Sequence, residues 1–217
     1  MDFATLFLYF VVMLACVGFT ALIPTHAFAE YNNTDTKWWK FYVIAIVPIM
    51  IYTLFWGLRY DVGADYLAYK DIFENPNDHW RIEVGFIGIN NVLKSLGGNY
   101  ISIFVFTSAV NILSVYSVCK KKNKDFACFS IFFYYTTSAV FFAQNGIRQM
   151  LCSSLVLFLL SIIGDINNDK KRRLNSILII LFGVAAYFIH KSSGVVFVIL
   201  LLLNMIPTIK MNKYIVL

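Results

Sequence analysis

Charged residues are scarce in this sequence. Only 14% of its 217 residues are Asp, Glu, Lys or Arg, whereas 59% are hydrophobic and 18% are aromatic. The mean hydropathy of +0.70 lies far outside the range of soluble domains. The apolar residues also form runs of about 18 or more, the length that a helix needs to cross a bilayer core. This scarcity of charge excludes an ordinary soluble domain and indicates an integral membrane protein.

The sequence also lacks the motifs of cofactor-dependent and disulfide-rich proteins. Its four cysteines form neither a metal-ligand pattern nor a disulfide framework. Cys16 and Cys152 fall inside apolar runs, while Cys119 and Cys128 flank a Lys-rich stretch that we expect in the reducing cytoplasm. We expect all four to be small buried or interfacial side chains. There is no P-loop, no GxGxxG motif and no internal repeat, so the sequence predicts no cofactor and no bound metal.

The apolar runs predict an all-α fold, a polytopic bundle of about seven transmembrane helices that forms one domain over residues 1–217. The expected spans are Phe3–Ile23, Phe41–Leu58, Ile101–Cys119, Phe126–Ala143, Ile147–Gly164, Leu174–Ile189 and Ser192–Ile209. The first run ends in Ala27–Ala29, which is similar to a signal-peptide cleavage site. Asp2 stands where a signal peptide has Lys or Arg, and the run is too long, so we favour a retained span over a cleaved leader.

A shorter apolar piece, EVGFIGINNVLKSLGG (Glu83–Gly98), lies between the second and third expected spans. Its apolar residues recur at helical spacing: Phe86, Ile89, Leu93 and Leu96. Because the piece is too short to cross a bilayer, it predicts an interfacial or re-entrant helix within an outward polar region of about residues 59–98. A cramped eighth span is the alternative.

The short loops predict the orientation of the chain. Most Lys and Arg residues gather in KKKNKD (Lys120–Asp125) and DKKRR (Asp169–Arg173), which the positive-inside rule places in the cytoplasm. The net charge of +6 therefore reports orientation and does not indicate binding to nucleic acid. The N-terminus is then outside and the C-terminus inside. The polar stretches Arg59–Phe86, Gln144–Gln149 and Ile189–Gly194 all face outside.

Two residues at the ends of expected spans are candidate site residues. Arg148 lies at membrane level in NGIRQM, where an unpaired guanidinium is costly. Arg148 is either an interfacial anchor whose side chain snorkels toward water, or a ligand whose planar guanidinium donates hydrogen bonds to a phosphate or carboxylate. His190 ends another span on the same expected face. The segment after it, Lys191–Ser193, could equally be a plain N-cap for the last helix.

Carboxylates are concentrated in the outward stretch Arg59–Phe86. It holds six acids and three bases: Asp61, Asp65, Asp71, Glu74, Asp78 and Glu83, and Arg59, Lys70 and Arg81. Polar residues are ordinary in an outward loop, but here the flexible Gly63 separates two of the acids, and Tyr66 and Tyr69 are interleaved with them. Carboxylates beside aromatic rings suit sugars, while the same tyrosines suit an interfacial belt equally well.

Four short motifs are more specific together than any one alone. RYDVGADYLAY (Arg59–Tyr69), EVGF (Glu83–Phe86), GIRQ (Gly146–Gln149) and HKSS (His190–Ser193) occur in this order around the expected spans. In this combination the chain resembles the EpsG family of membrane proteins, which is related to the Wzy-type polysaccharide polymerases of bacteria. The resemblance covers residues 40–207.

The resemblance extends to individual positions. Arg59, Gly63, Asp65 and Tyr69 match the first family motif, Glu83 the following acid, Arg148 and Gln149 the Arg-Gln pair, and His190 with Ser192 the His-x-Ser motif. Ala64 and Ser193 depart from it, at positions where Thr and Ala are expected. Family members also run beyond this length with further spans, so we expect the chain to be incomplete relative to the family.

The resemblance implies an enzyme of exopolysaccharide or capsule biosynthesis in the bacterial cytoplasmic (inner) membrane. Its substrate would be a polyprenyl-diphosphate-linked oligosaccharide, and the growing glycan would pass to the next lipid-linked repeat unit at the outer face. Arg148 and Arg59 would stabilise the departing diphosphate. His190, Asp65 or Glu83 would take the acceptor proton. The expected substrate-binding residues are Arg59, Asp61, Tyr66, Tyr69, Gln149 and Ser192.

Other ligands and functions are also open. Asp61 and Asp65 could hold Mg²⁺ with diphosphate oxygens, although no motif requires a metal. The expected partners besides membrane lipid are export and chain-length proteins. The rival functions are a non-enzymatic transporter or assembly partner in polysaccharide export, and an inactive truncated copy. A carrier places polar groups near the middle of the membrane. The expected spans hold few such groups (Asn111, Ser114, Thr136 and Thr137), which favours chemistry at the interface.

Overall fold

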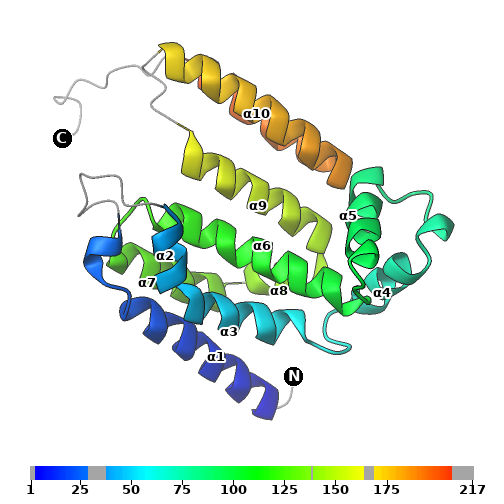
Figure 1. Ribbon diagram of the computed structural model, residues 1–217, viewed down its shortest axis with the longest axis horizontal. Helices are drawn as coiled ribbons and strands as arrows, with labels where there is room; N and C mark the ends of the chain where they lie inside the picture. Colours follow the sequence, from blue (N-terminus) through cyan, green and yellow to red (C-terminus); the bar gives the residue numbers. More distant parts are fainter. Residues whose placement is uncertain (1–2, 29–37, 138, 164–168, 207–217) are drawn as a thin grey trace.

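The computed structural model describes residues 3–28, 38–137, 139–163 and 169–206 (Figure 1). Throughout these ranges the chain forms helices and connecting turns and no strand, which confirms the predicted all-α fold. The α-helices are α1 (Phe3–Ala21), α2 (Trp38–Ile44), α3 (Ile46–Gly57), α4 (Tyr66–Glu74), α5 (Val84–Ser95), α6 (Ile101–Cys119), α7 (Lys124–Thr136), α8 (Ala139–Asn145), α9 (Ile147–Ile162), α10 (Asp169–Ile189) and α11 (Gly194–Met205). Within the described ranges, three short 3₁₀ helices accompany them: η1 (Thr25–Ala27), η3 (Pro76–Asp78) and η4 (Lys191–Ser193).

Helix α6 lies at the centre of the bundle. It packs against α3 on one side and α9 on the other, and it is apolar over most of its surface, as expected for a helix with neighbours all round. Helix α1 packs against α3 and α7 at one edge, and α10 packs against α9 and α11 at the other. The short helices α4 and α5 lie together at one end of the long helices (Figure 1).

Length and composition identify fewer membrane spans than the sequence predicts. Ile101–Cys119 and Lys170–Ile189 are long and apolar enough to cross a membrane, and α7 with α8 makes a third span if that bent pair is counted. Four other apolar helices, Thr5–Ala21, Ile46–Gly57, Ile147–Ile162 and Lys191–Met205, are shorter, with 10–17 residues each. The prediction of about seven spans is therefore not confirmed.

Two expected spans are each divided into two helices. The first, Phe41–Leu58, breaks at Ala45 between α2 and α3. The break has a local cause, because Pro48 cannot donate to Ile44 and its ring clashes with the carbonyl four residues earlier. The second, Phe126–Ala143, breaks where Thr137 is extended (φ −94°, ψ 173°), and the axes of α7 and α8 are bent by 61°. The expected end of the last span at Ile209 lies outside the described residues.

The region between α3 and α6 contains two helices where the sequence predicted one. The predicted short helix is α5, with Phe86 buried, although Leu96 follows the helix and is 78% exposed. Helix α4 was not predicted. Its buried residues, Tyr66, Tyr69, Ile72 and Phe73, recur at helical spacing and pack with Phe86 and Phe104 in one core cluster. The polar stretch is therefore a folded cap with its own apolar core.

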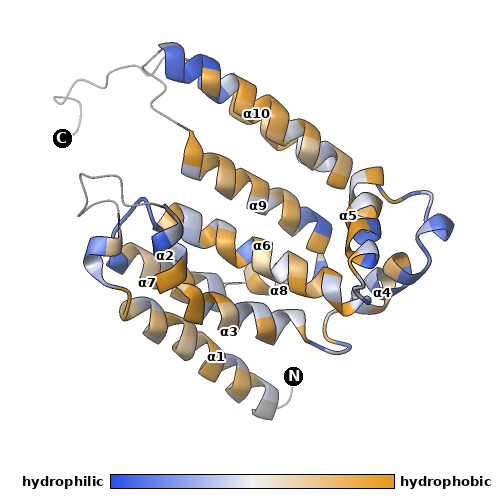
Figure 2. Ribbon diagram, viewed as in Figure 1, coloured by the Kyte–Doolittle hydropathy of each residue, from blue (hydrophilic) through white to orange (hydrophobic). Residues whose placement is uncertain are grey.

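Hydrophilic residues gather at the two opposite ends of the bundle (Figure 2). One end carries α4, α5 and the start of α9, and the other carries the start of α10 and the turn between α6 and α7. The Lys-rich turn and the RYDVGADYLAY motif thus lie at opposite ends, as a membrane protein with two wet faces requires.

The polar side chains half-way along α6 are paired within the protein. The side-chain oxygen Oδ1 of Asn111 accepts hydrogen bonds from the hydroxyls of Tyr52 at 3.0 Å and Tyr134 at 2.6 Å. The Ser114 hydroxyl donates to the backbone carbonyl of Asn111 at 2.6 Å. Because buried polar groups need such partners, these residues have a structural explanation within the bundle. All four cysteines are free, and three of them are buried.

Candidate functional site

Three distant segments bring charged side chains together at the end of the bundle that carries α4 and α5. Arg148 comes from the first turn of α9, Glu83 from the turn before α5, and His190 from the residue after α10. Arg148 forms an ion pair with Glu83 through Nη1 and Oε2. The other carboxylate oxygen, Oε1, accepts the backbone N–H of Lys191 at 3.2 Å and lies 3.7 Å from His190 Nδ1. Glu83 therefore joins α9, α5 and α10 at one point.

The local backbone explains how each side chain reaches this point. Glu83 precedes α5 in an extended conformation (φ −64°, ψ 138°), and its carboxylate does not cap that helix, so it is available to the other segments. His190 follows α10 in an extended conformation (φ −158°, ψ 109°), which turns the chain away from the helix. Arg148 is the second residue of α9, two positions after Gly146, which precedes the helix. All three residues thus stand at helix ends.

Burial strengthens the electrostatics of this cluster. The side chains of Glu83, Arg148 and His190 are only 9%, 22% and 18% exposed. Burial by itself raises the pKa of Glu83, but the Lys191 N–H and the nearby Arg148 and His190 outweigh it and hold the pKa below its ordinary value. Glu83 is therefore an anion at neutral pH. Among the described residues, Arg148 Nε and His190 Nδ1 are buried without a hydrogen-bond partner, so part of the cluster's hydrogen-bonding capacity is unused.

Gly85 permits the close approach of α5 to α10 on which the cluster depends. A Cβ atom at this position would lie 2.5 Å from the backbone oxygen of Phe188 and 2.7 Å from its carbonyl carbon. Backbone atoms cannot yield as a flexible side chain does. Gly85 lies two residues from Glu83, and Phe188 lies two residues from His190, so this contact sets the distance between the carboxylate and the imidazole.

We expect Gly85→Ala to disrupt the cluster although it changes no polar group. Helices α5 and α10 would have to separate, which should lower the thermal unfolding temperature and the activity proposed below. Gly88→Ala in the same helix is the matched control, because its Cβ would meet no atom within 4 Å. Replacing a helical Gly by Ala should stabilise that variant by about 0.5–1 kcal/mol. Equal behaviour of the two variants in detergent unfolding and activity assays would contradict this role of Gly85.

A cavity of about 420 Å³ opens beside the cluster, and three predicted site residues line it: His190, Gln149 and Ser192. Gln149 and Ser192 are exposed at its polar end, and the Gln149 side-chain nitrogen lies 3.5 Å from His190 Nε2. One nitrogen of His190 thus faces the carboxylate and the other lies beside a cavity. This arrangement can pass a proton between a ligand in the cavity and a ring whose charge Glu83 stabilises.

Arg59 lies apart from this cluster and is held by other residues. Its guanidinium donates to the carbonyls of Trp56 at 3.0 Å, Val62 at 3.1 Å and Gln144 at 2.9 Å, and to the Gln144 side chain. It also lies 4.6 Å from the ring centre of Phe104. Burial lowers the pKa of Arg59 to about 10, which leaves it charged at neutral pH. These contacts tie the end of α3 to α8, so the structure gives Arg59 a structural task.

The acids of the first motif lie on the surface. Asp61 and Asp65 are exposed in the turn before α4, and Asp61 adopts a positive φ of 50°, which Asp tolerates better than most residues. The Ala64 N–H holds this turn to α8 by donating to Asn145 Oδ1 at 2.7 Å, and Gly63 (φ 105°) permits the approach, because a Cβ there would lie 2.9 Å from the same oxygen. Across the described ranges, no three His, Cys, Asp or Glu side chains gather into a metal site. Mg²⁺ at Asp61 and Asp65 stays a prediction.

The two motif tyrosines are buried in the cap. Tyr66 is 1% exposed and stacks on Phe104, with ring centres 4.7 Å apart. Tyr69 meets Phe86 edge-on at 5.8 Å, and burial raises the pKa of its hydroxyl while the neighbouring Arg148 opposes this rise. Their rings are therefore covered by protein, whereas a ring that binds a sugar would be open to solvent. The sequence had supplied a signal for this burial, the helical spacing of Tyr66, Tyr69 and Phe73.

The family comparison agrees with the motifs that form the cluster. The model of the EpsG family matches residues 41–217, which contain all ten predicted site residues. The chain belongs to the EpsG family. Together with its apolar helices, this membership makes it a membrane protein of polysaccharide biosynthesis. The chain has no significant match among curated proteins or among solved structures.

Proposed function

We propose that this EpsG-family protein is a polysaccharide polymerase, which transfers a glycan from a polyprenyl-diphosphate carrier to a lipid-linked repeat unit. The observation that carries the proposal is the cluster of Arg148, Glu83 and His190 beside a cavity at one polar end of an apolar bundle. A lipid-linked sugar needs such a place, because its glycan and diphosphate are polar while its carrier is apolar.

Arg148 would stabilise the leaving group. When the bond between the anomeric carbon and the diphosphate breaks, negative charge develops on the departing oxygen, and a preorganised cation lowers the barrier. Arg148 uses Nη1 to bind Glu83, and its buried Nε has no partner among the described residues. The guanidinium can therefore hold the carboxylate and the diphosphate at once, which a single ammonium group cannot do.

His190 would act as the general base. The acceptor hydroxyl forms its bond to the anomeric carbon and gives its proton to the imidazole, while the diphosphate leaves with the bonding electrons. Glu83, 3.7 Å from His190 Nδ1, would stabilise the imidazolium that results. Asp65, the second candidate base, is exposed just before α4 and does not line the cavity, and Glu83 is already engaged by Arg148 and Lys191. This favours His190 over both acids.

The most direct assay uses the purified protein in vesicles with a polyprenyl-diphosphate-linked oligosaccharide, and it measures product length on extracted glycolipid. We expect His190→Ala to lose most polymer formation, since general-base catalysis contributes about two to four orders of magnitude in rate. His79→Ala is the matched control, because His79 pairs with Asp71 in the same outward region, outside the cluster. If the wild-type protein is supplied with its native substrate and yields only monomeric glycolipid, the proposal that it is a polymerase is wrong.

The membrane arrangement proposed with this function has seven crossing segments. They are α1, α2 with α3, α6, α7 with α8, α9, α10, and η4 with α11. The ends of the segments labelled in Figure 1 alternate between the two polar ends of the bundle (Figures 1 and 2). Helices α2 and α3 together cover residues 38–57, about 30 Å at 1.5 Å per residue, which suits a hydrocarbon core. In the bacterial inner membrane the cluster would face outside, with the N-terminus outside and the C-terminus inside. Export and chain-length proteins are the proposed partners.

Cysteine labelling tests this orientation. In a variant without the four native cysteines, we expect Asn77→Cys to react only from outside and Lys122→Cys only from the cytoplasm. Both positions are exposed, and Lys122 is preferred to Asn123 because the Asn123 side chain caps α7 by accepting the N–H of Phe126 at 2.8 Å. Labelling of both from one side, or the reverse pattern, would contradict the outward cluster and the mechanism with it.

A further inference from the structure

The cavity beside His190 is a groove between α9 and α11. These two helices both pack against α10, and the groove runs along the faces that they leave open. Its α9 wall consists of residues at positions i, i+3, i+4, i+7 and i+8, which form one face of a helix. These are Gln149, Cys152, Ser153, Val156 and Leu157.

The groove is polar at one end and mostly apolar along the rest, where Ser153 is the polar exception on α9. The polar end carries Gln149, His190 and Ser192 and adjoins the cluster. Beyond it, Val156 and Leu157 line the groove on α9, and Val196 and Phe197 line it on α11. From Gln149 to Leu157 the groove extends about 12 Å along α9, at 1.5 Å per residue. A ligand that fits it has a polar head at the cluster and a slender apolar tail between the helices.

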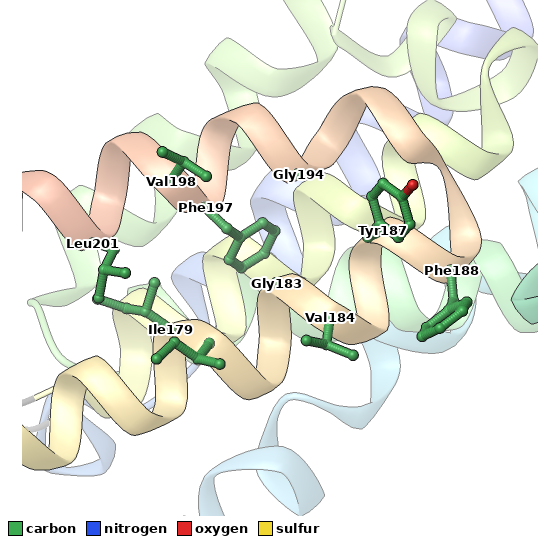
Figure 3. A pocket seen from close by; sticks show the side chains of 10 residues that line it. Ile179, Gly183, Val184, Tyr187, Phe188, Gly194, Phe197, Val198 and Leu201 are labelled. Atoms are coloured by element: carbon green, nitrogen blue, oxygen red, sulfur yellow. The ribbon is translucent and has the colours of Figure 1, made fainter.

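A second groove of similar size provides the contrast. It lies between α10 and α11, has a volume of about 450 Å³ and shares Phe197 with the first (Figure 3). Figure 3 shows Phe197 of α11 over Gly183 of α10, and a Cβ at Gly183 would lie 2.9 Å from that of Phe197. Tyr187 contributes its only polar side chain. This groove can hold apolar chains but has no charged group or imidazole to select among them.

We propose that the groove between α9 and α11 binds the polyprenyl chain of the diphosphate carrier, with the diphosphate at the polar end beside Arg148. This inference rests on the proposed function and assigns the place of its lipid. The groove meets the cluster at His190, which lines it and lies 3.7 Å from Glu83, and Arg148, the ion-pair partner of Glu83, would supply a second contact to the diphosphate through its Nε, which has no partner among the described residues. Its volume of about 420 Å³ suits one slender chain, which matches a single-chain polyprenyl lipid better than a two-chain phospholipid.

Two matched variants on α11 test the assignment. Val196 lines the groove between α9 and α11, Val198 lines the other groove, and both are exposed on the apolar surface, by 45% and 58%. The probe is a polyprenyl diphosphate with a photoreactive diazirine in its chain. We expect Val196→Trp to reduce crosslinking at least about tenfold, which corresponds to roughly 1.4 kcal/mol of binding, and Val198→Trp to leave it unchanged. Equal effects of the two variants would overturn the assignment.

Mapping the crosslinks in the wild-type protein keeps the test decisive if a variant fails to fold. We expect adducts on the faces of α9 and α11 that line this groove, and a distribution over the outer face of α10 would refute it. Unlabelled polyprenyl diphosphate should compete, whereas polyprenol, inorganic diphosphate and phosphatidylglycerol should compete poorly. If polyprenol competes as well as the diphosphate does, the polar end of the groove does not contribute to binding. Competition by phosphatidylglycerol would make the occupant an ordinary membrane lipid.

Crosslinking needs no turnover, so it separates this inference from the polymerase. Specific crosslinking at the groove in a protein that makes no polymer would leave the lipid site intact and refute the reaction. Polymer formation with crosslinks elsewhere would refute the groove and leave the reaction intact.

Discussion

Replacing Arg148 with Lys should abolish most polymer formation while membrane level and folding stay close to wild type. The change keeps the positive charge but loses the planar fork. In the structure one arm of that fork binds Glu83, and Nε is free of partners among the described residues. A lysine would have to choose between the carboxylate and the diphosphate. Losing a contact made to developing charge in the transition state costs roughly two to three orders of magnitude in rate.

The controls for Arg148→Lys come from the same outward region. Arg81→Lys makes an identical change at an exposed arginine, and it should be nearly silent. Lys191→Ala removes an exposed ammonium but keeps the backbone N–H that binds Glu83, so its effect should be mild. Polymer length should be read beside protein abundance. Wild-type polymer from Arg148→Lys at wild-type abundance would make Arg148 an interfacial anchor that only snorkels.

The sequence predicts the helical class and several helix boundaries because hydropathy and helix length are local properties. The bounds of α6 agree with the expected span Ile101–Cys119, and the piece after Glu83 forms the short helix α5. The break before Pro48 could also have been predicted from the sequence, since proline removes a helical hydrogen bond wherever it occurs. The bend at Thr137 was not, because threonine tolerates helices and only the packing of α7 and α8 on their neighbours fixes the angle.

The candidate site depends on contacts between residues that are distant in sequence. Glu83 and Arg148 are 65 positions apart, and no local pattern pairs them. The family motifs named both residues and His190, but the geometry that makes Glu83 the common partner comes only from the crossing of α5 and α10 at Gly85. Arg59 shows the opposite case. Its motif suggested a ligand for diphosphate, whereas its hydrogen bonds go to backbone carbonyls and to Gln144, 85 positions away.

Glu83→Gln should impair both stability and activity, because this carboxylate joins three segments. The amide keeps the size of the side chain and can still accept the Lys191 N–H, but it no longer neutralises Arg148 or stabilises a protonated His190. The Arg148–Glu83 pair is partly exposed to solvent, which screens it, so we expect a loss of about 1–2 kcal/mol in the free energy of unfolding. Polymer formation should fall by roughly two orders of magnitude, as when acid–base catalysis is impaired.

The pH dependence of stability separates the charge of Glu83 from its shape. Because the folded protein holds the pKa of Glu83 below its ordinary value, the stabilisation is full above the ordinary carboxyl pKa and is lost as the pH falls through the lowered one. The difference in unfolding temperature between wild type and Glu83→Gln should therefore narrow on acidification. Glu74→Gln, at an exposed position of α4 outside the cluster, is the matched control for this comparison. A Glu83→Gln protein with wild-type stability and polymer length would mean that the carboxylate only fills space, and that His190 and Arg148 work without it.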